Sequence, residues 1–183
     1  MMAHRRVLND KSLLYLFSFD VEADVEQQRL GSVNGGVRTN IQARPNLSRV
    51  YHILRDRTIA GLDVPAVSGV VHWGGDWLYW REDDVGISDV RFRIQTDDGA
   101  LIHGKYPVVC YLGSGGFRQL VTRRKKLGTE EEPAELPLVT TPRFQTTSAT
   151  YSWIEGLQCL GFGRLQVIRG EFRRITYDIY SLT

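Results

Sequence analysis

The stretch Trp73–Tyr106 constrains the fold most, because it combines a clear period-two pattern with closely spaced turn signals. Within it, Ile87–Gln95 alternates, with one face formed by Ser88, Val90, Phe92 and Ile94 and the other by Ile87, Asp89, Arg91, Arg93 and Gln95. Asp83–Gly86 and Asp97–Gly99 bound this run, and Asp and Gly at such positions supply the positive φ angles of tight hairpins. The stretch therefore predicts a meander of antiparallel strands.

Short strand-like segments recur along the rest of the chain at spacings of about ten residues. Strands are predicted at Ser12–Ala23, Ala100–His103, Pro107–Leu112, Leu138–Phe144, Leu157–Ile168 and Arg173–Leu182. Leu47–Ile59 fits either a short helix or a strand, with a strand favoured, and Thr150–Glu155 begins a short helix or a turn. The pattern predicts an all-β fold, a single closed antiparallel β-barrel of roughly nine or ten strands that is wide enough for one small ligand.

The 183 residues correspond in size to one domain, with residues 1–11 as an N-terminal tail. Gly113–Pro137 contains the runs GSGG, RRKK and EEEPAE and few apolar residues, which predicts one long, charged and mobile surface loop. Cys110 and Cys159 lie in apolar strand-like contexts, so we expect both to be buried free thiols.

Charge and hydropathy argue against several classes of partner. The net charge is +2, from 23 basic and 21 acidic residues, and the RRKK run is offset by EEEPAE, so we expect no nucleic-acid partner. No apolar run approaches the roughly 20 residues of a membrane span. The short run Leu13–Phe19 lacks the length of a signal peptide core. We therefore expect a cytoplasmic protein that has no membrane partner.

Metal and cofactor sites have no supporting motif. The four histidines, His4, His52, His72 and His103, lack H-x-x-x-H or H-x-H spacing, and the two cysteines lack C-x-x-C spacing. The run GSGG at Gly113–Gly116 lacks the Lys-Ser/Thr pair that follows in a phosphate-binding loop. We expect neither a metal nor a cofactor.

Several sequence blocks occur together and in a fixed order. They are GGDW at Gly74–Trp77, RFRIQTDDGALI at Arg91–Ile102, TPRFQT at Thr141–Thr146, TYSW at Thr150–Trp153 and YDIY at Tyr177–Tyr180. As a set, these blocks resemble the family catalogued as domain of unknown function 3237, which has a lipocalin-like (calycin-type) barrel. The charged insertion Gly113–Pro137 and the aromatic Leu78–Trp80 depart from the family pattern. The resemblance implies a role like that of fungal relatives, which tailor secondary metabolites and in some cases close ether rings by adding a hydroxyl across an alkene.

Four residues are candidates for acid–base or oxyanion chemistry. Asp98 shares its strand parity with Phe92 and Ile94, so we expect it to face the interior with a raised pKa and to act as a general acid. Asp76 in GGDW fits either a bulge or capping role or the same acid role, and His103 is a further candidate acid. Arg143 is expected to be the buried partner of an Asp or to bind an oxyanion of the ligand.

The remaining candidates would bind substrate. They are Trp73, Trp77, Trp80, Arg91, Phe92, Tyr106, Tyr151 and Trp153. Aromatic side chains in a barrel either fill the core or line a pocket for a flat hydrophobic ligand, and the sequence leaves both open. Arg91 shares a face with Asp89 and Arg93, so its side chain is expected to point outward unless a bulge shifts the register.

The leading functional hypothesis is a cofactor-free cyclase or isomerase of secondary metabolism. It would catalyse acid-assisted, hydroalkoxylation-type ring closure of a hydrophobic prenylated phenolic or polyketide. Asp98, Asp76 or His103 would donate the proton, and Arg143 with a Tyr would hold the phenolate. The alternatives are a lipocalin-like small-molecule binding protein without chemistry, and a structural or homo-oligomerising barrel that is filled by its own Trp side chains.

Overall fold

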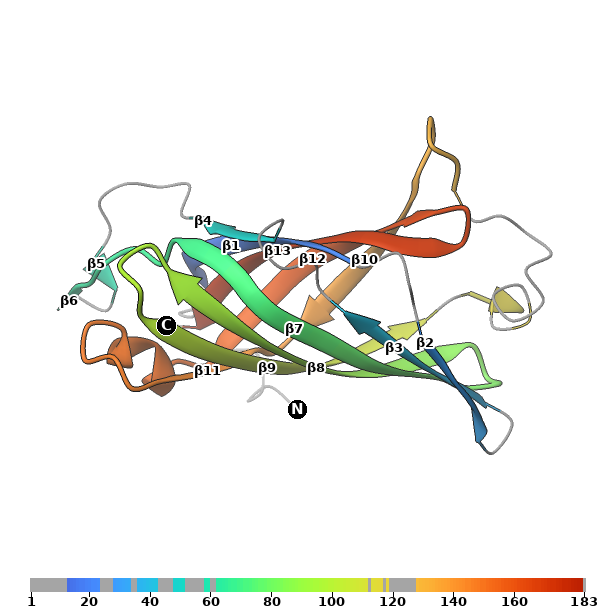
Figure 1. Cartoon of the computed structure of the whole chain (residues 1–183), viewed down its shortest axis with the longest axis horizontal. Helices are drawn as coiled ribbons and strands as arrows, with labels where there is room; N and C mark the ends of the chain where they lie inside the picture. The colour runs from blue at the N-terminus through green and yellow to red at the C-terminus, as the bar shows by residue number, and fades with distance from the viewer. Residues whose placement is uncertain are drawn as a thin grey trace, which may run out of the picture.

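A computed structural model describes residues 13–23, 28–33, 36–42, 48–51, 58–59, 62–111, 113–116, 118 and 128–182. Most of these residues lie in strands, which are accompanied by the short 3-10 helix η1 (Figure 1). The elements are β1 (Leu13–Glu22), β2 (Gln28–Val33), β3 (Gly36–Gln42), β4 (Arg49–Tyr51), β5 (Thr58–Ile59), β6 (Leu62–Asp63), β7 (Gly69–Trp80), β8 (Val85–Thr96), β9 (Leu101–Tyr111), β10 (Ala134–Thr140), β11 (Arg143–Thr146), η1 (Ser152–Gly156), β12 (Cys159–Ile168) and β13 (Glu171–Leu182).

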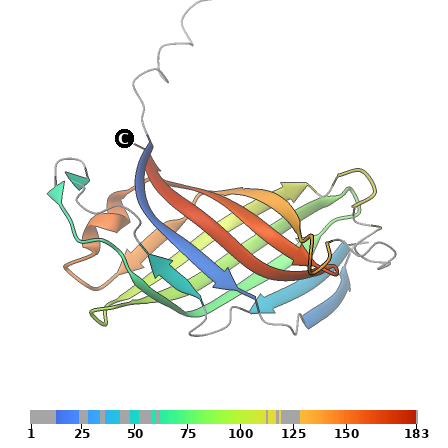
Figure 2. The same ribbon diagram turned by 90° about the horizontal axis from the view of Figure 1, so that it is seen from above.

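Eight of these strands close into an antiparallel barrel. Following the pairing around the ring gives β7, β8, β9, β10, β12, β13, β1 and β4, which returns to β7. Figure 2 shows the long β1 and β13 side by side in this wall. β11 follows β10 along the same edge of β9, and the β2–β3 hairpin pairs with the second half of β7. Closure satisfies the backbone groups that open sheet edges would leave unpaired.

The two ends of the barrel differ in the strand ends and turns that form them. We call one the Trp80 end, where β7 finishes and β13 begins, and the other the Asp98 end, which holds the tight β8–β9 turn. Antiparallel alternation brings these strand ends together around the ring. At the Asp98 end η1 lies against the barrel and buries Ile154 (Figure 1).

Alternation along the strands decides which side chains fill the core. In β8, Phe92 and Ile94 point inward and are buried, whereas Arg91, one residue before Phe92, points outward. The half of the interior toward the Asp98 end is packed with aromatic rings: Phe17 and Phe92 each lie edge-on to Phe144, and Phe19 packs on Phe92. This half is apolar and solidly filled, so any chemistry inside the barrel belongs to the other half.

The structure confirms the all-β fold, the closed antiparallel barrel and its calycin-like architecture. The segment Thr150–Glu155 contains the start of η1, which ends at Gly156. The ambiguous Leu47–Ile59 contains the strands β4 and β5, with 47 and 52–57 outside the described residues. The predicted C-terminal boundary of the loop Gly113–Pro137 is too far along the chain, because Ala134–Pro137 already belong to β10 and pair with β12. The expected tail at 1–11 and the basic run at 123–126 lie outside the described residues.

Candidate functional site

The half of the barrel toward the Trp80 end contains a small interior cavity of about 30 Å³. Its walls are largely apolar, and its polar groups are a carboxyl, two phenols, a hydroxyl and a thiol. The lining residues are Asp76, Leu78, Trp80, Ser88, Val90, Tyr106, Val108, Cys110, Leu138, Leu165, Phe172, Ile175 and Tyr177. A space of this size accommodates one water molecule or one small group of a ligand.

Asp76 is the ionisable group at the centre of this cavity. It lies in the middle of β7, opposite Val90, on the face that also carries the inward Leu78 and Trp80. Burial raises its pKa from 3.8 to about 6, and the nearby charge of Asp89 adds to the rise. A hydrogen bond donated by the Ser88 hydroxyl acts in the opposite direction. The carboxyl can therefore gain and lose a proton near neutral pH, as a general acid or base requires.

Two buried tyrosines stand beside this carboxyl. The rings of Tyr106 on β9 and Tyr177 on β13 meet edge-on, with 5.5 Å between their centroids. A hydrogen bond between the two hydroxyls raises the pKa of Tyr106 and lowers that of Tyr177. Burial raises the pKa of both phenols, and the Asp76 charge raises it further, so both remain protonated donors at neutral pH.

Gly163 on β12 leaves the room that the Tyr177 ring of the neighbouring β13 occupies. A Cβ on Gly163 would lie 2.4 Å from the Tyr177 Cδ1 atom, so only glycine lets the ring lie flat against β12. At the Trp80 end, the Trp80 and Phe172 rings pack 6.0 Å apart and both are buried. These two rings cover the cavity on that side.

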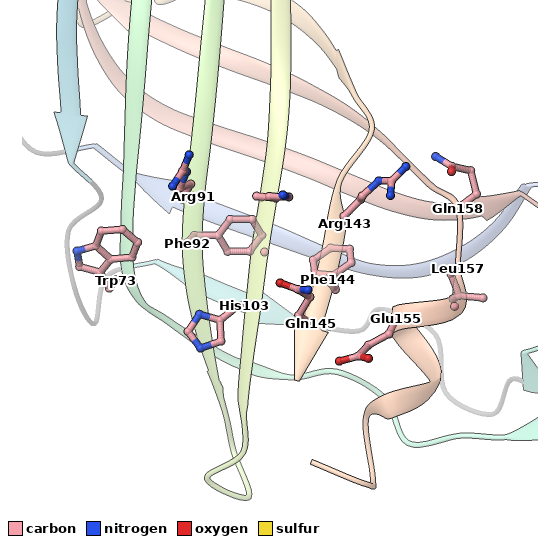
Figure 3. Close-up of a pocket in the computed structure, with 13 residues that line it drawn as sticks. Trp73, Arg91, Phe92, His103, Arg143, Phe144, Gln145, Glu155, Leu157 and Gln158 are labelled. Carbon is pink, nitrogen blue, oxygen red and sulfur yellow. The ribbon is translucent and has the colours of Figure 1, made fainter. Parts of the chain in front are cut away.

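A second concavity, the outer groove, lies on the opposite surface of the same wall. It has a volume of about 610 Å³ and lies between the outer face of β8, β9 and β11 and the segment Glu155–Gln158. Its lining residues are Trp73, Arg91, Phe92, His103, Gly104, Lys105, Arg143, Phe144, Gln145, Glu155, Gly156, Leu157 and Gln158. Figure 3 shows Trp73 on one side of this groove and Glu155 and Gln158 on the other.

The structure thus divides the predicted site residues between two places. Asp76, Trp80 and Tyr106 meet in the interior cavity, whereas Trp73, Arg91, Phe92, His103 and Arg143 border the outer groove. Arg91 points outward as expected and pairs with Asp89 at 2.9 Å. Trp77 is half exposed and packs beside Trp73, with 6.5 Å between the ring centroids. Trp153 packs against the core outside both places.

The expectation that Asp98 faces the interior with a raised pKa is wrong. Asp98 lies in the exposed β8–β9 turn, where the chain leaves the strand and parity no longer sets its direction. Thr96 donates a hydrogen bond to its carboxylate and lowers its pKa, and the buried Tyr151 donates another. This is the local capping typical of Asp in turns.

The expectation that Arg143 is a buried partner of an Asp is also wrong. Arg143 is the first residue of β11 and its side chain is exposed, because the inward position of this strand belongs to Phe144. Within the described part of the chain, Arg143 has no ion-pair partner. It stays an anion-binding candidate, but on the outer surface.

The sequence reasoning missed Ser88, Cys110 and Tyr177 as members of the interior site. The signal for Ser88 was present, because it shares the inward face of Ile87–Gln95 with Phe92. Tyr177 likewise has the same strand parity as Ile175 and Ile179, whose side chains point inward. Both cysteines are free, and burial raises the pKa of Cys159 to about 12.

Within the described residues, no group of three or more His, Cys, Asp or Glu side chains is placed to hold a metal ion. The helical part of the described chain is too short to cross a bilayer.

Solved structures with the same fold come from bacteria and a fungus. A conserved protein of unknown function from Rhodopseudomonas palustris is 19% identical with a TM-score of 0.71, covering 94% of this chain and 98% of that chain. A β-barrel-like protein from Acinetobacter baumannii is 20% identical with a TM-score of 0.64, covering 94% and 96%. An enzyme from Penicillium herquei is 13% identical with a TM-score of 0.56, covering 94% and 95%. At these identities the likeness shows the fold alone.

No curated protein matches the chain. Residues 13–182 match the family described as "Protein of unknown function (DUF3237)", which includes every strand of the barrel. The chain therefore belongs to the DUF3237 family.

Proposed function

We propose that the chain is an enzyme that uses Asp76 as a general acid on a hydrophobic phenolic substrate held in the Trp80 half of the barrel. The observation that carries this proposal is a buried carboxyl with a pKa of about 6 beside two protonated phenols in an apolar cavity. Perturbed carboxyls of this kind are concentrated at active sites. The Penicillium herquei enzyme has the same fold, so this barrel is compatible with catalysis.

The reaction that fits this group of residues is intramolecular ring closure of a prenylated phenol. Protonated Asp76 gives its proton to one alkene carbon, so that a C–H bond forms and the π bond breaks. The phenol oxygen then attacks the cationic carbon and forms the C–O bond. The phenol proton returns to the Asp76 carboxylate, which restores the acid. The product is an isomer of the substrate, and no oxidant, reductant or cofactor is consumed.

The neighbouring side chains have roles in the same step. The Trp80 and Tyr177 rings line the cavity and can stabilise the cationic carbon through their faces. The hydroxyls of Tyr106 and Tyr177 share one hydrogen bond, so the hydroxyl that does not donate in it can donate to the phenol oxygen of the substrate and orient it. Holding both reacting ends in one apolar site contributes several kcal/mol through proximity. The free cavity is about 30 Å³, so substrate entry requires the Trp80 and Phe172 rings to move.

The experiment is an assay of a panel of prenylated phenols and polyketides by chromatography and mass spectrometry. We expect a product of unchanged mass with a shifted retention time. Asp76→Asn should abolish its formation, whereas the matched control Asp98→Asn, which changes an exposed turn carboxylate, should leave it intact. If Asp76→Asn turns over the substrate at the wild-type rate, the role of Asp76 is wrong.

A binding protein without chemistry is the second candidate, and the outer groove favours it, since about 610 Å³ matches the size of small-molecule sites. Mass spectrometry separates the two functions, because a carrier releases its ligand unaltered. We propose in either case a hydrophobic aromatic ligand and a cytoplasmic location.

A further inference from the structure

The outer groove contains a row of three cationic side chains on adjacent strands. Arg91 on β8 lies directly opposite Lys105 on β9, and Lys105 lies directly opposite Arg143 on β11. All three side chains are exposed and point to the same face, away from the interior cavity. Like charges directly opposite one another destabilise a sheet, so this row opposes the stability of the barrel wall.

The carboxylates nearby offset little of this charge. Asp89 pairs with Arg91, but within the described residues Lys105 and Arg143 have no ion-pair partner. Glu155, the one carboxylate that lines the groove, already accepts a hydrogen bond from the Thr146 backbone N–H at 2.6 Å. The groove therefore has an excess of positive charge that a bound anion would balance.

A second observation lies in the next row of side chains. Arg93 lies between Trp73 and His103 in the strand register. Its Nε atom is buried and has no hydrogen-bond partner within the described part of the chain. A buried guanidinium nitrogen without an acceptor carries a desolvation cost. Arg93 does not line the groove, so its cationic charge adds to the positive potential beside the groove without a direct contact to the ligand.

Trp73 gives the groove an aromatic wall beside these cations. Its ring is 45% exposed and lines the groove, so its face is open to a ligand. Gly75 is the next outward position of β7 after Trp73 and lies opposite Arg91. It has no side chain, so it leaves Arg91 uncovered on the β7 side. Figure 3 shows Trp73 and Arg91 bordering the same space. An aromatic ring stacked on Trp73 would place an attached anion over the cationic row.

We propose that the outer groove is a separate binding site for a small aromatic oxyanion, a molecule with a carboxylate or phosphate group and an aromatic ring. The cations Lys105 and Arg143 bind the anionic group, with Arg91 beside them, and Trp73 stacks on the ring. The site is independent of Asp76, because no residue lines both the outer groove and the interior cavity.

The test uses phenyl phosphate as the probe in isothermal titration calorimetry, with inorganic phosphate and benzyl alcohol as comparisons. We expect phenyl phosphate to bind most tightly, inorganic phosphate less tightly, and benzyl alcohol not at all. Lys105→Gln combined with Arg143→Gln should weaken phenyl phosphate binding at least tenfold. The control Arg164→Gln, an exposed cation on β12, should change nothing. Asp76→Asn should bind like the wild type, so this test does not depend on the proposed catalytic role.

Thermal unfolding without a probe supplies a second readout. Because the double variant relieves like-charge repulsion, its Tm should equal or exceed that of the wild type, and phenyl phosphate should raise only the wild-type Tm. A lower Tm would indicate a structural role for the row and overturn the proposal. So would equal affinity for benzyl alcohol, or no phenyl phosphate binding at roughly millimolar concentration. Binding of heparin alone would assign the groove to a polyanion and overturn it too.

Discussion

Asp76 and Ser88 form a hydrogen bond inside the barrel, with the Ser88 hydroxyl donating to the Asp76 carboxylate from the neighbouring strand. Both side chains lie on the inward faces of β7 and β8. This contact lowers the pKa of Asp76, whereas burial raises it more strongly, to about 6. The balance of the two effects sets the proton affinity on which the proposed chemistry depends.

Replacing Asp76 by Asn should change how stability depends on pH. The pKa of Asp76 is about 6 in the folded chain and 3.8 in its ordinary state, so protonated Asp76 favours folding. The contribution of the protonated carboxyl to the free energy of unfolding is complete below pH 4. It is lost as pH rises through 6, which lowers the stability by about 3 kcal/mol in total. Urea unfolding at pH 4 and pH 7 should show this loss in the wild type and in Asp83→Asn, a variant of an exposed aspartate. If Asp76→Asn showed the same loss of stability between pH 4 and pH 7, the raised pKa would not belong to Asp76.

Replacing Ser88 by Ala removes the one contact that lowers the pKa of Asp76. We expect the pKa of Asp76 to rise above 6, and the fall in stability to move to higher pH. The same urea series measures this shift. Ser152→Ala, which removes an exposed hydroxyl of η1, is the control. If the stability of Ser88→Ala fell at a lower pH than that of the wild type, the role of Ser88 would be contradicted.

Replacing Tyr106 by Phe removes the hydroxyl that is hydrogen-bonded to Tyr177. An unmade buried hydrogen bond costs about 1–3 kcal/mol, and we expect a loss in this range by chemical denaturation. Tyr111→Phe changes a phenol that is 66% exposed and should lie within about 0.5 kcal/mol of the wild type. Equal stability of the two variants would show that the Tyr106 hydroxyl bonds nothing.

Replacing Trp80 by Ala should enlarge the interior cavity and destabilise the barrel. The Trp80 ring is 2% exposed and packs on Phe172, and such truncations cost about 3–5 kcal/mol. Val109→Ala, at a side chain that is 69% exposed, should cost less than about 0.5 kcal/mol. If Trp80→Ala also speeds the binding of hydrophobic ligands inside, the ring is the barrier to entry. If the stability is unchanged, the cavity is not closed by this ring.

Strand alternation and turn chemistry allowed the closed barrel to be predicted, because the fold repeats one local pattern many times. The same logic placed Phe92 inward and Arg91 outward correctly. It failed for Asp98, since parity ends where the strand ends and the turn residue bonds to its own neighbours. The error for Arg143 has another cause, because alternation continues through the buried Thr140, Pro142 and Phe144 and would have placed Arg143 outward.

The interior site could not be predicted from the sequence as a set. Asp76, Tyr106 and Tyr177 are far apart along the chain, and they meet only because β7, β9 and β13 belong to one closed ring. The pKa of Asp76 depends on the burial that this closure creates. GGDW identified the residue, but its environment is a property of the whole barrel.

The most direct test of the central claim is a carbon-13 NMR titration of the Asp76 side-chain carboxyl, assigned by its absence in Asp76→Asn. We predict a midpoint near pH 6, because the carboxyl is buried among apolar side chains and two phenols. A midpoint at or below 3.8, the ordinary value, would show that the carboxyl is solvated or paired with a cation. That result would contradict a general acid inside the barrel.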